Sequence, residues 1–133
     1  MNDLIAEMKR RVPYWGTLGL ELLEIGDGRA TMAVTFRPQH LQNGVMHGGV
    51  VASLIDSACA CAAISRIDPD AHATSVNLQV TYLKAVTGGR LTARAECLRA
   101  GRRILFTEAR VVNDAGELVA TGTSQLVRIA PGG

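Results

Sequence analysis

Asn43-Gly44-Val45-Met46-His47-Gly48-Gly49 opens the stretch that decides the fold, and VVASLIDSACACAAI continues it from Val50 to Ile64. The residues from Val50 onward are apolar on every side, which predicts a helix that is buried all round. The glycine pair before it leaves the first backbone N–H groups unhindered by side chains. These groups lack partners within the helix and carry the positive end of its dipole, so they can bind an anion or a polarised carbonyl oxygen.

Asp56 is the one acidic residue in this predicted helix, and its only polar neighbours there are Ser53 and Ser57. A carboxylate in such surroundings is costly unless it is paired, hydrogen-bonded or open to a cleft. A buried aspartate that bonds to a loop is the structural alternative, but the nearby His47 and the glycine-led start favour a functional role. The helix face of Asp56 also carries small residues that leave room for another molecule, namely Ala52, Ala60 and Ala63.

The Asn43-Gly44-x-x-His47-Gly48-Gly49 motif, with an acid nine residues after the histidine, resembles the acyl-CoA thioesterases of the hotdog fold. It is most similar to their phenylacetate-degradation, or PaaI-like, group, and the resemblance extends over nearly the whole chain. It implies an α+β hotdog fold, in which an antiparallel sheet wraps around one long buried helix. It also implies an acyl-CoA thioester hydrolase that yields a free acid and CoA.

Length and composition indicate one domain over residues 1–133, and the segment patterns below lead us to expect a cytoplasmic protein. A net charge of +2 is too small to imply nucleic-acid binding, and no apolar run is suited to a signal peptide or a membrane span. The three cysteines, Cys59, Cys61 and Cys97, lack metal-type spacing and are expected as small core residues in a reducing compartment.

Periodicity predicts a helix over Asp3–Val12 that Pro13 stops, and then a Tyr14–Thr17 loop. Trp15 in this loop is expected to cover the core or its edge, and a place in a pocket lining is the alternative. A hairpin of Leu18–Ile25 and Arg29–Arg37 follows, and then a Pro38–Met46 loop. Arg66–Ala71 is predicted as a connection and Ala130–Gly133 as a loose tail. The strands predicted after the central helix are Ala73–Leu83, Leu91–Leu98, Ile104–Val112 and Leu118–Ile129. Strands on both sides of one apolar helix favour an antiparallel sheet wrapped around it.

Strict alternation in Ala73–Leu83 predicts two faces. One face carries the apolar side chains Val76, Leu78, Val80 and Tyr82. The other is polar but uncharged, with Ser75, Asn77, Gln79 and Thr81, and either meets water or packs against another subunit.

Thioester hydrolysis needs donors for the carbonyl oxygen, a nucleophile or general base, and an apolar acyl pocket. We assign the Gly48 N–H as the donor and Asp56 as the nucleophile or base. The two residues are eight apart on one predicted helix, about 12 Å of rise, so one carbonyl does not easily touch both in the same subunit.

The resemblance implies a site shared across a dimer, in which one subunit supplies Asn43, His47 and Gly48 and the other supplies Asp56 and Ser75. It implies that His47 and Asn43 orient the loop and the substrate or position water, and that Ser75 holds the attacking water. The structural alternatives are a capping role for His47, a turn for Asn43 and an ordinary strand position for Ser75.

Other polar residues give weaker signals. His40 and His72 are predicted to be loop residues without metal-ligand spacing to His47, and neither a metal nor a cofactor is expected.

Some hotdog thioesterases use a glutamate at the Asp56 position with a hydroxyl residue one turn later. Here that later position is Ala60, so the chain fits the hotdog thioesterases that use an aspartate. Four basic residues can meet CoA phosphates, although solvated surface charge is the alternative for each: Lys84, Arg90, Arg102 and Arg103.

The expected partners are an acyl-CoA substrate and further copies of the chain, as a dimer or as a homotetramer made of dimers. The acyl group is either aryl or arylacetyl, or a medium or long chain. Two rival functions stay open, a non-catalytic acyl-CoA-binding protein and a hydratase or dehydratase, although the preserved Asp56 argues for chemistry and the surrounding sequence is unlike the hydratases.

Overall fold

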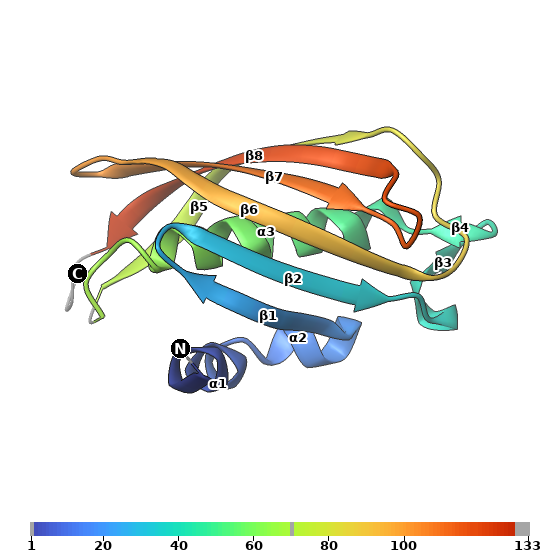
Figure 1. Cartoon of the computed structure of the whole chain (residues 1–133), viewed down its shortest axis with the longest axis horizontal. Helices are drawn as coiled ribbons and strands as arrows, with labels where there is room; N and C mark the ends of the chain where they lie inside the picture. Colours follow the sequence, from blue (N-terminus) through green and yellow to red (C-terminus); the bar gives the residue numbers. More distant parts are fainter. Residues whose placement is uncertain (1, 70, 130–133) are drawn as a thin grey trace.

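The computed structural model describes residues 2–69 and 71–129, so the predicted Ala130–Gly133 tail lies outside the described residues. An antiparallel sheet curves around one long helix, α3, while two short helices lie beside the first strand (Figure 1). The elements in chain order are α1 Asn2–Arg11, α2 Pro13–Leu18, β1 Leu20–Gly26, β2 Arg29–Thr35, the 3-10 turn η1 Pro38–His40, β3 Leu41–Gln42, β4 Val45–Met46, α3 Gly48–Ile64, β5 His72–Tyr82, β6 Arg90–Ala100, β7 Ile104–Val112 and β8 Leu118–Ile129.

The main sheet has six strands in the order β1-β2-β6-β7-β8-β5, and every neighbouring pair is antiparallel. This confirms the predicted α+β layout of a sheet wrapped around a helix. The alternation of apolar and polar residues predicted β7 and β8 best, since the predicted bounds of these two strands match the observed ones. In β7 the buried Leu105, Ala109 and Val111 alternate with exposed Glu108 and Arg110, as expected when one sheet face packs on a core.

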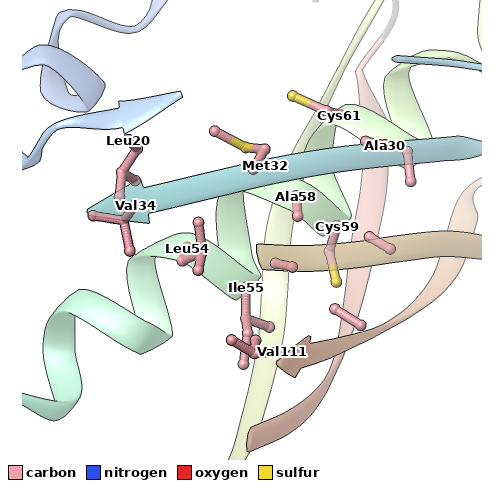
Figure 2. Close-up of a cluster of buried hydrophobic side chains, with 14 of the residues drawn as sticks. Leu20, Ala30, Met32, Val34, Leu54, Ile55, Ala58, Cys59, Cys61 and Val111 are labelled. Atoms are coloured by element: carbon pink, nitrogen blue, oxygen red, sulfur yellow. The ribbon is translucent and has the colours of Figure 1, made fainter. Parts of the chain in front are cut away.

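The central helix packs one broad face into the core. Side chains of α3 share a cluster with Met32 and Val34 of β2 and with Val111 of β7 (Figure 2). The prediction of a helix buried all round was wrong for one stripe, which is only half-buried in the single chain: Gly48, Gly49, Ala52, Ser53, Asp56, Ser57, Ala60 and Ile64. Ala63, expected beside Asp56 on the open face, is fully buried.

The N-terminal segment differs from its prediction because Pro13 begins a second helix after ending the first. Proline is well suited to the first helical position, where its missing N–H needs no partner. The predicted Tyr14–Thr17 loop is therefore the helix α2, which Gly19 ends in a left-handed conformation with φ 79°. Trp15 is buried, as expected of a residue that covers the core, and its Nε1–H donates to Ser57 Oγ at 2.9 Å.

The predicted loop over residues 38–46 also has regular structure, because η1 and the β3–β4 hairpin occupy most of it. Two strands extend beyond an end predicted for them. β6 continues to Ala100 instead of ending at Leu98, and β5 begins at His72, which was expected in a loop.

β5 forms one edge of the sheet and contains a bulge that changes which side chains share a face. The pairing with β8 shifts register between Ser75 and Asn77, so Val76 is the extra residue. Strict alternation had put Ser75 on the polar face with Asn77. The bulge instead turns Ser75 toward α3, where its hydroxyl contacts a helix side chain.

At Gly122 the sheet approaches α3 closely. A Cβ there would lie 2.6 Å from Ile55 Cγ2 and 3.0 Å from the Gln79 carbonyl oxygen. We therefore expect Gly122→Ala to destabilise the protein by about 1–3 kcal/mol, the usual cost of overpacking. Thermal unfolding checks this, with Gly16→Ala as the control because a Cβ there meets nothing within 4 Å and alanine favours the helix. Equal melting temperatures for Gly122→Ala and wild type would contradict the expectation.

Candidate active site

The first turn of α3 has one free backbone donor. His47 is the N-cap, and its Nδ1 accepts a hydrogen bond from the Gly49 N–H at 2.7 Å. The Val50 N–H donates to the His47 carbonyl oxygen at 3.0 Å. Within residues 2–69 and 71–129, the N–H of Gly48 makes no hydrogen bond. This N–H is therefore available to an incoming carbonyl oxygen at the positive end of the helix.

The Gly48 carbonyl, by contrast, is held from the neighbouring strand. The Tyr82 hydroxyl donates to it at 2.7 Å. A Cβ on Gly48 would lie only 3.1 Å from that hydroxyl oxygen and from the ring carbon that carries it, so the ring of Tyr82 packs directly against this glycine. The sequence pattern had placed Tyr82 as an apolar face residue, and it gave no signal of this contact across 34 residues.

His40 is a structural residue rather than the loop residue expected from the sequence. It is 2% exposed, and its Nδ1 accepts from the Arg37 N–H at 3.2 Å. That acceptance leaves Nε2 as the protonated nitrogen, which donates to the Leu18 carbonyl oxygen at 2.8 Å. The His40 carbonyl oxygen in turn accepts from the His47 N–H at 2.7 Å, so His40 anchors the residue that caps α3.

Asn43 lies at the exposed tip of the β3–β4 hairpin. Asn43 and Gly44 both have positive φ, 52° and 86°, as a two-residue type I′ turn requires. The structure thus gives Asn43 a turn-forming role, and the described residues make no side-chain hydrogen bond to it.

Asp56 lies two turns farther along α3, half-buried, and Ser75 Oγ donates to its Oδ1 at 2.8 Å. The bulge in β5 aims this serine at the helix. A carboxylate held through one oxygen keeps lone pairs for an attacking role. Asp56 and Ser75 thus form one group within a single chain, while His47 and Gly48 form another at the start of the helix.

The thiols near Asp56 do not compete as nucleophiles. Burial raises the pKa of Cys59 to about 11, and the Asp56 charge adds to the shift in that pKa. Burial also raises the pKa of Cys61 to about 12. Because the thiolate is the reactive form, both side chains are inert at neutral pH, as expected for core cysteines.

An open groove of about 400 Å³ lies where β5 ends and α3 begins, with Gly48 and Tyr82 in its wall. Its other lining side chains are mostly apolar and include Val45, Met46, Val51, Leu83 and Val86. Such a surface suits the apolar part of a ligand whose carbonyl reaches the Gly48 N–H.

Two of the four candidate phosphate-binding residues already have acidic partners. Lys84 Nζ lies 3.1 Å from Glu117, and Arg90 Nη1 lies 2.8 Å from Glu21. Arg102 and Arg103 are exposed at the turn after β6 and form no ion pair within the part of the chain that the structure describes.

Sequence and structure comparisons identify the family to which the protein belongs. The family model of the thioesterase superfamily matches residues 43–120, more than half of the chain, and the chain belongs to this family. This confirms the hotdog fold expected from the sequence, and the chain is a thioester hydrolase. No helix among the described residues has the length and apolar character that a membrane span requires.

Particular relatives support the same assignment. The medium/long-chain acyl-CoA thioesterase YigI of Salmonella typhimurium is 29% identical over 91% of this chain and 89% of its own length. A solved mutant structure of the phenylacetic acid degradation protein PaaI from Thermus thermophilus is 32% identical, with a TM-score of 0.79 over 86% of this chain and 97% of that chain. The conserved protein PA5202 of Pseudomonas aeruginosa is also 32% identical, with a TM-score of 0.84 over 87% and 93% of the two chains. The predicted resemblance to PaaI-like thioesterases is therefore confirmed.

Proposed function

We propose that the protein is an acyl-CoA thioesterase that works as a homodimer, with each active site shared between two copies. The Gly48 N–H of one copy holds the thioester oxygen, and Asp56 of the other copy attacks the carbonyl carbon or activates water. The observation that carries the proposal is the separation of these groups on α3: eight residues, or about 12 Å of helix rise. One thioester cannot reach both groups of the same chain.

The chemistry follows from the two groups. As the carbonyl carbon is attacked, its oxygen gains negative charge, and the Gly48 N–H and the helix dipole stabilise that charge. In the covalent route, an Asp56 oxygen bonds to the carbon, the C–S bond breaks, CoA leaves as a thiolate, and water then hydrolyses the anhydride. In the general-base route, Asp56 takes a proton from the water whose oxygen bonds to the carbon. Both routes give the free acid and CoA, and Ser75 orients the Asp56 carboxylate in each.

The exposed edge of β5 supports pairing with a second copy. β5 is eleven residues long, and no strand of the described residues pairs with its outer side. Val76 and Leu78 are 59% and 37% exposed. A long edge with apolar side chains invites another strand. The half-buried stripe of α3 beside this edge is further surface that a second copy would cover.

The direction of β5 explains how such pairing completes the site. Ser75, near one end of β5, contacts Asp56, and Tyr82, at the other end, contacts Gly48. Antiparallel pairing of two β5 strands about the middle of the strand brings the end that carries Ser75 beside the end of the partner strand that carries Tyr82. Asp56 of one copy then faces the start of α3 in the other. In this arrangement His47 and Asn43 belong with Gly48 on one side of the substrate, where they orient the loop and the acyl group.

For the acyl group we propose either an arylacetyl or aryl group, or a medium or long chain. The names of YigI and PaaI point to these two classes, and the groove beside Gly48 is apolar enough for both. A cytoplasmic location, where acyl-CoA is made and used, fits such a substrate. Dimers can assemble further into a homotetramer through the outer face of β5, where Asn77, Gln79 and Thr81 are exposed and uncharged.

The test is thiol release from aryl, arylacetyl, short-chain and long-chain acyl-CoA, together with the sedimentation behaviour of the protein. We expect a dimer or larger assembly that releases CoA thiol from at least one class. The buried cysteines will add little to the thiol signal. Binding of acyl-CoA with no release from any class would overturn the enzymatic proposal in favour of a ligand-binding role.

A further inference from the structure

The peptide group between Gly48 and Gly49 is held at both ends by side chains from different parts of the chain. Its carbonyl oxygen accepts from the Tyr82 hydroxyl at 2.7 Å, and its N–H donates to His47 Nδ1 at 2.7 Å. The two side chains lie on opposite sides of this peptide, because the C=O and N–H of a trans peptide point in opposite directions. They form a clamp on a single peptide plane.

This clamp acts where the backbone is least constrained by its own side chains. Glycine loses more conformational freedom on folding than any other residue, and two adjacent glycines make the first turn of a helix easy to distort. The first turn also has few backbone hydrogen bonds of its own. The Gly48 N–H belongs to the preceding peptide, which meets this one at the Gly48 Cα. A change in ψ of Gly48 would therefore turn that N–H relative to the axis of α3. The direction of the free donor therefore depends on what holds this peptide.

We propose that Tyr82 is a positioning residue for thioester hydrolysis, because its hydroxyl fixes the Gly48–Gly49 peptide and so keeps the Gly48 N–H directed at the groove. The inference rests on the proposed function and names a residue that acts on the donor rather than on the substrate. His47 supplies the other half of the clamp, which gives its capping bond a part in catalysis.

The packing of the Tyr82 ring explains why the donor is a glycine. With the ring carbon that bears the hydroxyl 3.1 Å from the position of a Gly48 Cβ, any side chain at residue 48 would press on the ring. The ring also lines the groove, and Tyr82 is 52% exposed. Hydroxyl and ring have separable tasks: the hydroxyl sets the donor, and the ring bounds the space beside it.

The first experiment removes only the hydroxyl. In Tyr82→Phe the ring stays, so we expect kcat to fall about three- to tenfold, as for the loss of one neutral hydrogen bond, with KM within about twofold of wild type. Tyr14→Phe is the matched control, because Tyr14 is also 52% exposed and its hydroxyl bonds to Ser53 Oγ of the same helix at 2.8 Å. We expect Tyr14→Phe to retain the wild-type kcat. A Tyr82→Phe variant with the wild-type kcat would overturn the inference.

The second experiment observes the donor directly. Asp56→Asn is used to trap a thioester labelled with carbon-13 at the carbonyl, and infrared spectroscopy measures its stretching frequency. We expect the bound carbonyl to absorb at lower frequency than free thioester, and the added Tyr82→Phe change to move it back toward the free value, whereas Tyr14→Phe does not. A lowered frequency that Tyr82→Phe leaves unchanged would overturn the role of Tyr82 while the proposed function stands. If the carbonyl bound to Asp56→Asn absorbs at the frequency of free thioester, the Gly48 N–H does not donate to it. That result would overturn both the proposed role of Gly48 and the inference about Tyr82.

Discussion

Asp56→Asn is expected to reduce kcat for acyl-CoA hydrolysis by at least about a hundredfold, the scale of a lost general base or nucleophile. Asparagine has the shape of aspartate and keeps an oxygen that accepts from Ser75 Oγ, so the local hydrogen bond survives. What it lacks is the negative charge and the ability to take a proton. Because Asp56 is half-buried on α3 and forms no ion pair within the described residues, its fold contribution is small and the melting temperature should stay close to wild type.

Asp114→Asn is the control for this result. Asp114 Oδ2 accepts from the Arg90 N–H at 3.1 Å in the turn after β7, so the change again removes a carboxylate that accepts one hydrogen bond. We expect wild-type kcat for this variant. Steady-state thiol release measures kcat of both variants. Equal activity in Asp56→Asn and wild type would mean that another group performs the attack.

The second large effect is expected at Gly48, where a substitution by proline removes the free N–H donor. Gly48 is the first residue of α3, a position that proline favours, and His47 before it has ψ 134°, in the range allowed for a residue that precedes proline. Gly48→Pro therefore removes the free N–H without breaking the helix. We expect kcat to fall about 10²- to 10³-fold below that of Gly48→Ala, as for the loss of an oxyanion donor.

Gly48→Ala is the matched control because it adds the same Cβ against Tyr82 and keeps the N–H. The ring of Tyr82 must yield by a few tenths of an ångström in both variants, so their ratio isolates the donor. Thiol release and circular dichroism of the two proteins give this comparison. Equal kcat values would show that the Gly48 N–H does not hold the reacting carbonyl.

The sequence predicted the central helix and the sheet around it because a single pattern of apolar residues marks each of these elements. An apolar run without charges other than Asp56 can only be a core helix, and strict alternation in β7 and β8 allows one register with a buried face. α2 was missed because Pro13 both stops one helix and starts another, and local residue preferences do not separate these two roles.

The site was predicted only in part, for reasons of geometry. Asp56 and Gly48 stand out as an acid in an apolar helix and a glycine at its start. The face of Ser75 depends on a bulge, and a bulge is a property of the pairing between β5 and β8 rather than of either sequence. The Tyr82 contact depends on the position of the end of β5, and His40 reads as a loop residue until its two ring nitrogens are seen to bond within the chain.

In the mechanism that we propose, one helix carries both reacting groups, and the eight residues between them keep them apart. The proposal therefore makes the second copy a part of the active site rather than a means of adding stability. The half-buried stripe of α3, the open edge of β5 and the separation of Gly48 from Asp56 all have the same explanation in a dimer.

Subunit complementation tests this most directly. Asp56→Asn and Gly48→Pro chains carrying different affinity tags are produced together, and the mixed dimer is purified through both tags. If the site is shared, the mixed dimer combines Gly48 of the first chain with Asp56 of the second in one intact site. It should then show about half of the wild-type kcat per dimer, although each parent retains only about a hundredth or less. A mixed dimer as inactive as both parents would contradict the shared site and would require the two groups to act within one chain.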